Sequence, residues 1–238
     1  MGGENNVVDR MQAYIEAWEK AGDRRAIFLS CYEMMTRNML AAIEAGVFED
    51  QAWVSALLHR FAEYYFTALE AYESGQGLPV VWKLAFTASQ RPQSHVLQDL
   101  ILGVNAHINY DLVFALGDML MPEWSSLSPE GRLSRYRDHC HVNQIINQTI
   151  NIVQDQVVDR YAPGMRLVDK LMGPLDEWMT AWFIADWREE VWKNANLLVE
   201  SIAESDREVL RQKVEAHSVE RAQSLLGEEG FSGLLDLI

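Results

Sequence analysis

Cysteine and basic residues are both scarce in this sequence. Only two of its 238 residues are cysteine, Cys31 and Cys140, which is too few for a disulfide framework and favours a reducing, cytoplasmic location. The 20 Lys and Arg residues are outnumbered by 35 Asp and Glu residues, giving a formal net charge of −15. Because phosphate backbones and anionic membranes attract basic surfaces, this charge argues against nucleic acid and against a membrane as partners.

Long apolar runs and common enzyme signatures are missing as well. No uninterrupted apolar run reaches the roughly 18 residues that a membrane span needs. The first residues, Met-Gly-Gly-Glu-Asn-Asn, have neither the basic nor the apolar region of a signal peptide. The sequence has no phosphate-cradling glycine-rich loop, nucleophile elbow or H-E-x-x-H motif. These absences leave a small molecule as the expected partner.

What the sequence has in abundance is apolar residues at helical spacing. The hydrophobic fraction is 49% and the aromatic fraction 10%, enough for one large core. No stretch alternates as a strand would, so we expect an all-α protein, a single globular multi-helix domain of eight or nine helices over residues 1–238. Residues 1–6 and the tail 227–238 are expected to be peripheral, the apolar tail docking on the body or on another subunit of a homo-oligomer. Glycines, prolines and capping residues predict helices over about 7–21, 23–45, 50–74, 80–89, 94–121, 129–161, 174–203 and 205–226.

One run, Leu102-Gly-Val-Asn-Ala-His-Ile-Asn-Tyr-Asp-Leu112, places four polar side chains inside the most apolar of these helices. At 100° per residue, Asn105 and Asn109 share one face of the helix, and His107 and Asp111 share a nearly opposite face. Buried polar groups are costly unless they have partners. The run therefore predicts either a ligand site or a tight hydrogen-bond network between helices.

The His107 and Asp111 pair is the leading catalytic candidate. One helical turn separates the two side chains, so both can reach a single divalent metal ion such as zinc, iron or manganese. Alternatively, the carboxylate can orient the imidazole as a general base. The structural alternative is a core histidine whose hydrogen bond is satisfied by the neighbouring carboxylate.

Two further segments carry candidate metal ligands. Asp138, in Asp138-His-Cys-His-Val-Asn143, can complete a site with the central helix, whereas His139, Cys140 and His141 point about 100° apart and cannot share one ion. His59 and Glu63 form another pair one turn apart, and such pairs from facing helices build metal sites in bundles. The Glu-x-x-His signature of ferritin-like di-iron proteins is missing. A boundary position for His59 and a solvated helix face around Asp138 are the structural alternatives.

Candidate substrate contacts are Asn105, Asn109, Asn143, Trp82, Arg188 and Trp192. Arg188 lies in a tryptophan-rich segment and can pair with a buried carboxylate or with the acidic group of a ligand. Trp178, Trp182 and Trp192 are most simply core residues at helical spacing. Trp82 and the pair Tyr64 and Tyr65 can line an apolar pocket.

Four features of the sequence together resemble an uncharacterised family of bacterial all-helical proteins that is known only as a domain of unknown function. They are Asn105-Ala-His-Ile-Asn-Tyr-Asp-Leu112, Pro79-Val-Val-Trp82, Asp138-x4-Asn143 and Trp182-x9-Trp192-x2-Ala195. The resemblance spans about residues 25–200 and implies that His107, Asn109, Asp111, Asp138 and Asn143 belong to one shared site. It implies no reaction.

A narrower similarity covers one helix. Leu102-Gly-x3-His107-x3-Asp111-Leu112 is similar to the zinc-binding helix of phospholipase C and S1/P1-type nucleases, which use a trinuclear zinc cluster against phosphoesters. That helix normally continues into Pro-x-His, and Val113-Phe-Ala-Leu-Gly117 replaces this continuation here.

The sequence therefore predicts a metal-dependent enzyme, more a hydrolase than an oxidase, that acts on a small, partly apolar organic substrate. In this reading His107, Asp111 and Asp138 are catalytic and metal-binding, and the asparagines position the substrate. The alternative is a non-catalytic helical protein, ligand-binding or structural, whose buried polar network fixes how its helices pack.

Overall fold

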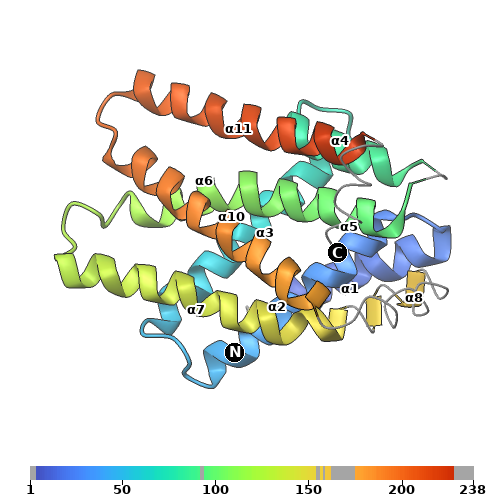
Figure 1. Cartoon of the computed structure of the whole chain (residues 1–238), viewed down its shortest axis with the longest axis horizontal. Coiled ribbons are helices and arrows are strands. Elements are labelled where there is room, and N and C mark those ends of the chain that lie inside the picture. The colour runs from blue at the N-terminus through green and yellow to red at the C-terminus, as the bar shows by residue number, and fades with distance from the viewer. Residues whose placement is uncertain (1–3, 92–93, 154–155, 158, 162–174, 228–238) are drawn as a thin grey trace.

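A long helix runs through the middle of the molecule, and the other helices pack around it (Figure 1). In the computed structural model, which describes residues 4–91, 94–153, 156–157, 159–161 and 175–227, this central helix has three parts. They are α5 (Val96–Asn105), the π-helical turn η1 (Ala106–Asp111) and α6 (Leu112–Leu120). The remaining helices are α1 (Glu4–Ala21), α2 (Arg25–Glu44), α3 (Gln51–Glu73), α4 (Val80–Ser89), α7 (Pro129–Val153), α8 (Asp159–Tyr161), α10 (Leu175–Glu200) and α11 (Glu204–Leu226).

The predicted fold class is confirmed. Every regular element within the described residues is helical, and with the central helix counted once and the three-residue α8 left aside there are eight helices. The predicted start signals hold too, since Asp50 accepts a hydrogen bond from the amide of Trp53 and Ser128 from that of Gly131. Gly22, Gly46 and Gly75 have positive φ angles of 69° to 72° just after α1, α2 and α3, as expected of glycines that end helices. Within the predicted helix 129–161, the structure describes α7 over Pro129–Val153 and α8 over Asp159–Tyr161, and residues 154, 155 and 158 lie outside the described residues.

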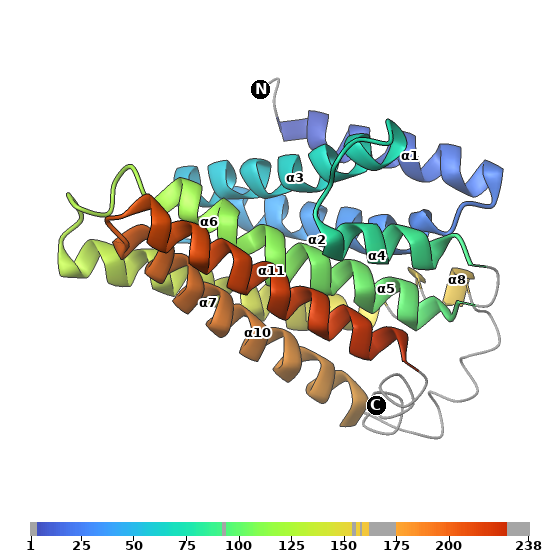
Figure 2. The same ribbon diagram turned by 90° about the horizontal axis from the view of Figure 1, so that it is seen from above.

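The helices form two groups with the central helix between them. Figure 2 shows α1 and α3 on one side of α5 and α6, and α10 and α11 on the other. The central helix packs against α2, α3, α4, α10 and α11, and α2 also packs against α1 and α7. The largest fully buried side chains of the described residues come from α1 to α4 and from the central helix, among them Trp82, Tyr65, Phe66, Met11 and Leu116.

Gly103 allows α2 to approach the central helix closely. A Cβ atom at this position would lie 2.4 Å from ring carbons of Phe28, much closer than carbon atoms pack. Phe28 is therefore held against the backbone of α5, one turn before His107. This contact decides which aromatic side chains can surround the histidine.

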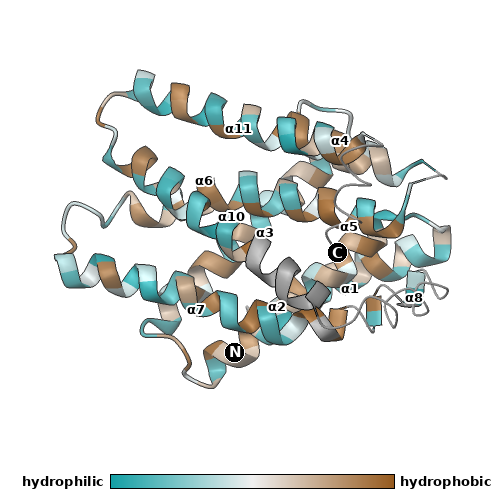
Figure 3. Cartoon of the chain, viewed as in Figure 1, coloured by the Kyte–Doolittle hydropathy of each residue, from teal (hydrophilic) through white to brown (hydrophobic). Residues whose placement is uncertain are grey.

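The central helix is a core helix. By length and composition alone Val96–Leu120 could cross a membrane, but 67% of that window is buried inside the structure. Helix α11, in contrast, lies at the outer edge and alternates hydrophilic and hydrophobic residues along its length (Figure 3). The side chains of Trp178 and Trp182, and residues 228–238 of the predicted tail, lie outside the described residues.

Candidate functional site

Three of the four polar residues, His107, Asn109 and Asp111, lie in the π-helical turn η1, and Asn105 immediately precedes it. As predicted, each pair bonds within itself four residues apart: Asn109 Nδ2 donates to Asn105 Oδ1 at 3.0 Å, and His107 Nδ1 lies 2.9 Å from Asp111 Oδ2. All four residues are buried, with 0–6% of each exposed. π-Helical turns of this kind occur frequently at functional sites.

The asparagine pair joins the central helix to α11. Asn105 Nδ2 donates to the carbonyl of Ser218 at 2.9 Å, and the Ser218 hydroxyl lies 3.1 Å from the carbonyl of Asn109. Asn105 and Asn109 therefore face α11 and not the side chain of His107. Three of their four side-chain polar atoms are hydrogen-bonded in this way, whereas Oδ1 of Asn109 is buried without a partner, and their role as substrate contacts stays a prediction.

The His107 and Asp111 pair faces the opposite way and is joined by Trp82 of α4. The indole Nε1–H of Trp82 lies 3.1 and 3.0 Å from the two carboxylate oxygens of Asp111. Asp111 is therefore held between an indole and an imidazole at 1% exposure. One polar atom of this group has no partner: Nε2 of His107 is buried without a hydrogen bond.

Aromatic rings from α2 and α3 enclose the imidazole. Phe61 stacks on it with 3.6 Å between ring centroids and 9° between planes, and Tyr32 meets it edge-on at 4.3 Å. Phe28, Tyr65 and Trp82 surround it at about 6 Å. Phe61 is the half-buried member, so its ring separates His107 from the surface. The hydroxyl of Tyr32, like Nε2, is buried without a partner.

Burial sets the protonation of the pair. It lowers the pKa of His107 well below its usual value and raises the pKa of Asp111 well above its usual value, although the Trp82 hydrogen bond opposes the second shift. Burial disfavours both the imidazolium of His107 and the ionised carboxylate of Asp111, so each residue is neutral. One hydrogen then lies between Nδ1 of His107 and Oδ2 of Asp111. In that state the imidazole also carries hydrogen on Nε2, which makes the unpartnered atom a buried donor.

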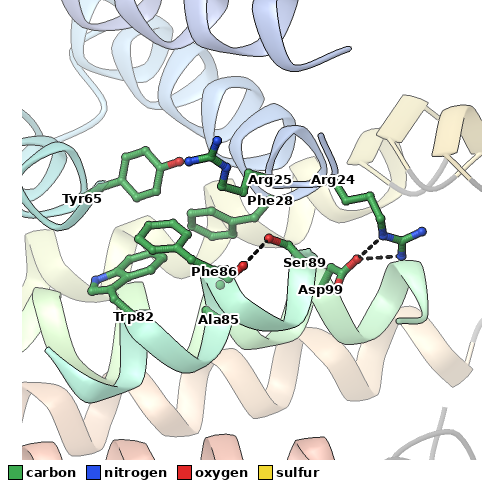
Figure 4. A pocket seen from close by; sticks show the side chains of 10 residues that line it. Arg24, Arg25, Phe28, Tyr65, Trp82, Ala85, Phe86, Ser89 and Asp99 are labelled. Atoms are coloured by element: carbon green, nitrogen blue, oxygen red, sulfur yellow. Dashed lines mark hydrogen bonds and ion pairs between the residues drawn. The ribbon is translucent and has the colours of Figure 1, made fainter. Parts of the chain in front are cut away.

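A small hollow lies on the other side of the same aromatic cluster. It encloses about 270 Å³ of empty space, counting its open mouth, and its walls include Phe28, Tyr65, Trp82 and Phe86. Figure 4 shows the hydroxyl of Tyr65 directed toward the guanidinium of Arg25. This hydroxyl is also buried without a hydrogen bond. Of the residues predicted to line an apolar pocket, Trp82 and Tyr65 line this hollow together with charged Arg24, Arg25 and Asp99, whereas Tyr64 bonds to Asp118.

Asp138 lies away from His107 and binds backbone. Its two carboxylate oxygens accept hydrogen bonds from the amides of Glu49 and Asp50, at 2.7 and 2.9 Å, where α3 begins. Phe61, which stacks on His107, lies 11 residues beyond Asp50, or about 16 Å along the helix. The predicted shared site of His107 and Asp138 is therefore not assembled, because the carboxylate of Asp138 caps α3 instead.

His59 and Glu63 are also separate from His107. Nδ1 of His59 lies 2.9 Å from the carbonyl of Ser55 one turn earlier, and exposed Glu63 pairs with Arg10. Among the described residues, no three His, Cys, Asp or Glu side chains lie close enough together to hold one metal ion. The predicted ligand set of His59, Glu63, His107, Asp111 and Asp138 is thus divided among three places.

Asn143, Arg188 and Trp192 form a second buried polar group, between α7 and α10. Nε of Arg188 donates to Oδ1 of Asn143 at 2.7 Å, and His139 joins the group through both of its ring nitrogens. The ring of Trp192 lies 5.1 Å from that of His139. The structure therefore divides the predicted substrate contacts among α4, α11 and the α7–α10 interface.

Sequence reasoning missed the enclosure contributed by α2. Phe28, Tyr32 and Thr36 are spaced four residues apart and all are buried, which was the available signal.

The comparison with family models confirms the predicted membership of a family of unknown function. Residues 5–228 match DUF5995, a family of unknown function. Since the match covers nearly the whole chain, the protein belongs to this family. No curated protein and no solved structure matches it.

Proposed function

We propose that the protein acts on a small, partly apolar organic molecule bearing a hydrogen-bond acceptor, with His107 and Asp111 as the acid–base couple. The observation that carries the proposal is Nε2 of His107, which is buried without a partner. Every other polar atom of the pair is engaged. A buried donor without an acceptor costs about 1–3 kcal/mol, and an oxygen of a bound molecule would remove that penalty.

The surroundings favour a molecule with an apolar body. Phe28, Phe61 and Tyr65 present rings around the imidazole, and aromatic walls with a few polar groups are typical of small-molecule sites. Phe61 is half-buried, so a movement of this one side chain would open the imidazole face. Donation from Nε2 to a carbonyl or ester oxygen would then make the pair a general acid.

The competing roles account for less of this geometry. A purely structural pair explains the bond from Trp82 to Asp111 but leaves Nε2 without a role. A divalent metal would also have to reach Nε2, because Nδ1 and both carboxylate oxygens are engaged. Binding of zinc, iron or manganese by His107 therefore stays a prediction, and the metal would bind Nε2, the atom that donates in the acid–base proposal.

The test compares two probes of nearly equal size, acetophenone with its carbonyl oxygen and ethylbenzene without one. The change in unfolding temperature with each probe is measured for the wild type, for His107→Phe and for the matched control His59→Phe. We expect acetophenone to stabilise the wild type and the control more than ethylbenzene does, and this preference to vanish in His107→Phe, which keeps a ring but loses Nε2.

Equal effects of the two probes on the wild type would contradict the proposal. The same three proteins are also titrated with zinc chloride. If zinc stabilises the wild type and His59→Phe but not His107→Phe, His107 is a metal ligand and the proposal of an acid–base couple is wrong.

A further inference from the structure

Arg188 is a buried cation without an anionic partner. It lies on α10 with 5% of its surface exposed, and it forms no ion pair with any Asp or Glu of the described residues. The adjacent carboxylate of Glu189 accepts from Tyr136 and lies near Lys193 instead. Buried charges in proteins are normally paired, so this arrangement needs an explanation.

The groups that do contact the guanidinium are neutral. Nε donates to Asn143 Oδ1, and Nη2 donates to the carbonyl of His139 at 2.8 Å. The ring of His139 is also neutral by its hydrogen bonds: its Nε2 must donate to the carbonyl of Arg188, so its Nδ1 is left to accept from Nη2. Within the described residues, every group that accepts a hydrogen bond from the guanidinium is therefore neutral.

One nitrogen of the guanidinium, Nη1, is available to donate further hydrogen bonds. No hydrogen bond from Nη1 is formed within the described part of the chain. Burial lowers the pKa of Arg188 to about 10, which reflects the cost of holding this charge away from water. Asn143 is half-buried, so the polar group around Arg188 lies nearest to the surface at this residue.

We propose that Arg188 binds the carboxylate of a small organic anion at the α7–α10 interface. This site is separate from the His107 centre and does not depend on the function proposed for it. A carboxylate fits because arginine binds planar oxygen pairs well and because the site offers a single positive charge, which a phosphate dianion would exceed. The rings of His139 and Trp192, 5.1 Å apart, provide a wall for an apolar body.

The decisive variant supplies the missing carboxylate from the protein. Asn143→Asp changes one atom at a position that already accepts from Nε of Arg188, so an internal ion pair should form and compete with any bound anion. The matched control is Asn147→Asp, one turn further along α7 on an exposed position, which changes the net charge equally. Benzoate binding to both variants and to the wild type is measured at constant ionic strength with chloride as the replaced anion.

We expect benzoate to raise the unfolding temperature of the wild type and of Asn147→Asp beyond the effect of chloride. Asn143→Asp should unfold at a higher temperature than the wild type when benzoate is absent. It should bind benzoate at least about tenfold more weakly, since tenfold corresponds to one lost charge-assisted hydrogen bond. A benzoate effect equal to that of chloride, or one that persists in Asn143→Asp, would overturn the proposal. So would a larger effect of phosphate than of benzoate.

Ligand-observed NMR with 4-fluorobenzoate gives a readout that does not rely on unfolding. The wild type should broaden the fluorine signal and Arg188→Gln should not. Broadening of equal size by both proteins would place the anion elsewhere on the molecule and reject the site.

Discussion

Gly103 and His107 lie one turn apart on the central helix and are constrained in opposite ways. At Gly103 no side chain fits, because Phe28 occupies the space that a Cβ would need. At His107 a large polar ring fits only because aromatic side chains enclose it and Asp111 binds one of its nitrogens. The close approach of α2 at the glycine brings Tyr32 and Phe28 to the histidine. A change at either residue should therefore affect the same aromatic cluster.

The first residue-scale prediction concerns Gly103→Ala. In an ordinary helix this change stabilises by up to about 1 kcal/mol, but here the new methyl group would overlap the ring of Phe28, and we expect a loss of about 1–3 kcal/mol. Gly117→Ala is the matched control on the same helix, since its Cβ would meet only Leu198 at 4.0 Å. Urea unfolding measures both variants, and a similar change in both would contradict the account.

The second residue-scale prediction concerns pH and Asp111. Burial raises the pKa of Asp111 in the folded protein above its usual 3.8, so the folded state holds a proton that the unfolded state has released. The stability that Asp111 contributes is complete below pH 3.8 and is lost as the pH rises toward the folded pKa. The free energy of unfolding of the wild type relative to Asp111→Asn should therefore fall by up to about 1.4 kcal/mol per pH unit above pH 3.8.

Unfolding at a series of pH values from 4.5 to 8 tests this slope. His139 is buried in both proteins and its pKa is lowered in both, so its contribution cancels in the difference. A difference that grows with pH would mean that the folded protein holds Asp111 ionised, and the neutral pair would be wrong.

At the scale of single elements, local signals explain most of the helices but not the π-helical turn. Helix starts and ends depend on residues that act on their own neighbours, such as Asp50 and Gly46, and sequence reasoning found them. The division of the polar run into two opposite faces was also predictable from helical periodicity. The π turn was not, because it depends on one additional residue within the hydrogen-bond ladder and no residue type marks it.

Asp138 shows the same limit across a longer distance. Its hydrogen-bond partners, the amides of Glu49 and Asp50, lie 89 and 88 positions away in the sequence. A carboxylate in a segment that also holds His139, His141 and Asn143 suggested a ligand for a metal, and nothing local distinguishes that role from capping another helix. The pairing is decided by how α7 and α3 pack.

The capping role predicts the consequence of removing this carboxylate. Asp138→Ala removes a buried carboxylate and leaves the amides of Glu49 and Asp50 without their acceptor at the start of α3, so we expect it to destabilise the protein by about 1–3 kcal/mol. Asp118→Ala removes a carboxylate from an exposed pair with Arg60 and should cost less than about 1 kcal/mol. Hydrogen exchange at the first turn of α3 should accelerate only in the first variant, and protection there as in the wild type would reject the capping role.

At the scale of the whole molecule, composition predicted the fold class, whereas the spatial grouping of polar residues required the structure. The apolar periodicity is enough to require a helical core, because each helix must bury its apolar face. Which polar residues meet depends on the order in which helices surround the central one. Eight of the predicted site residues therefore lie in three places: around His107, around Arg188, and at the contact with α11.

The net charge of −15 gives the molecule-scale prediction. Mutual repulsion of excess carboxylates destabilises the compact state, and salt screens it over a Debye length of about 8 Å at 0.15 M. Raising sodium chloride from low ionic strength to that level should therefore raise the unfolding temperature. Exposed ion pairs such as Arg10 with Glu70 act in the opposite direction but contribute about 0–1 kcal/mol each. A lower unfolding temperature in salt would show that these pairs dominate.

The most direct test of the central claim is nitrogen-15 NMR of the His107 ring, with its signals assigned by their absence from His107→Phe. The account predicts that Nε2 carries hydrogen at neutral pH and that its resonance moves when acetophenone, but not ethylbenzene, is added. A bare Nε2 in the free protein, or a resonance that ignores both probes, would contradict the claim that this atom is a donor for a bound molecule.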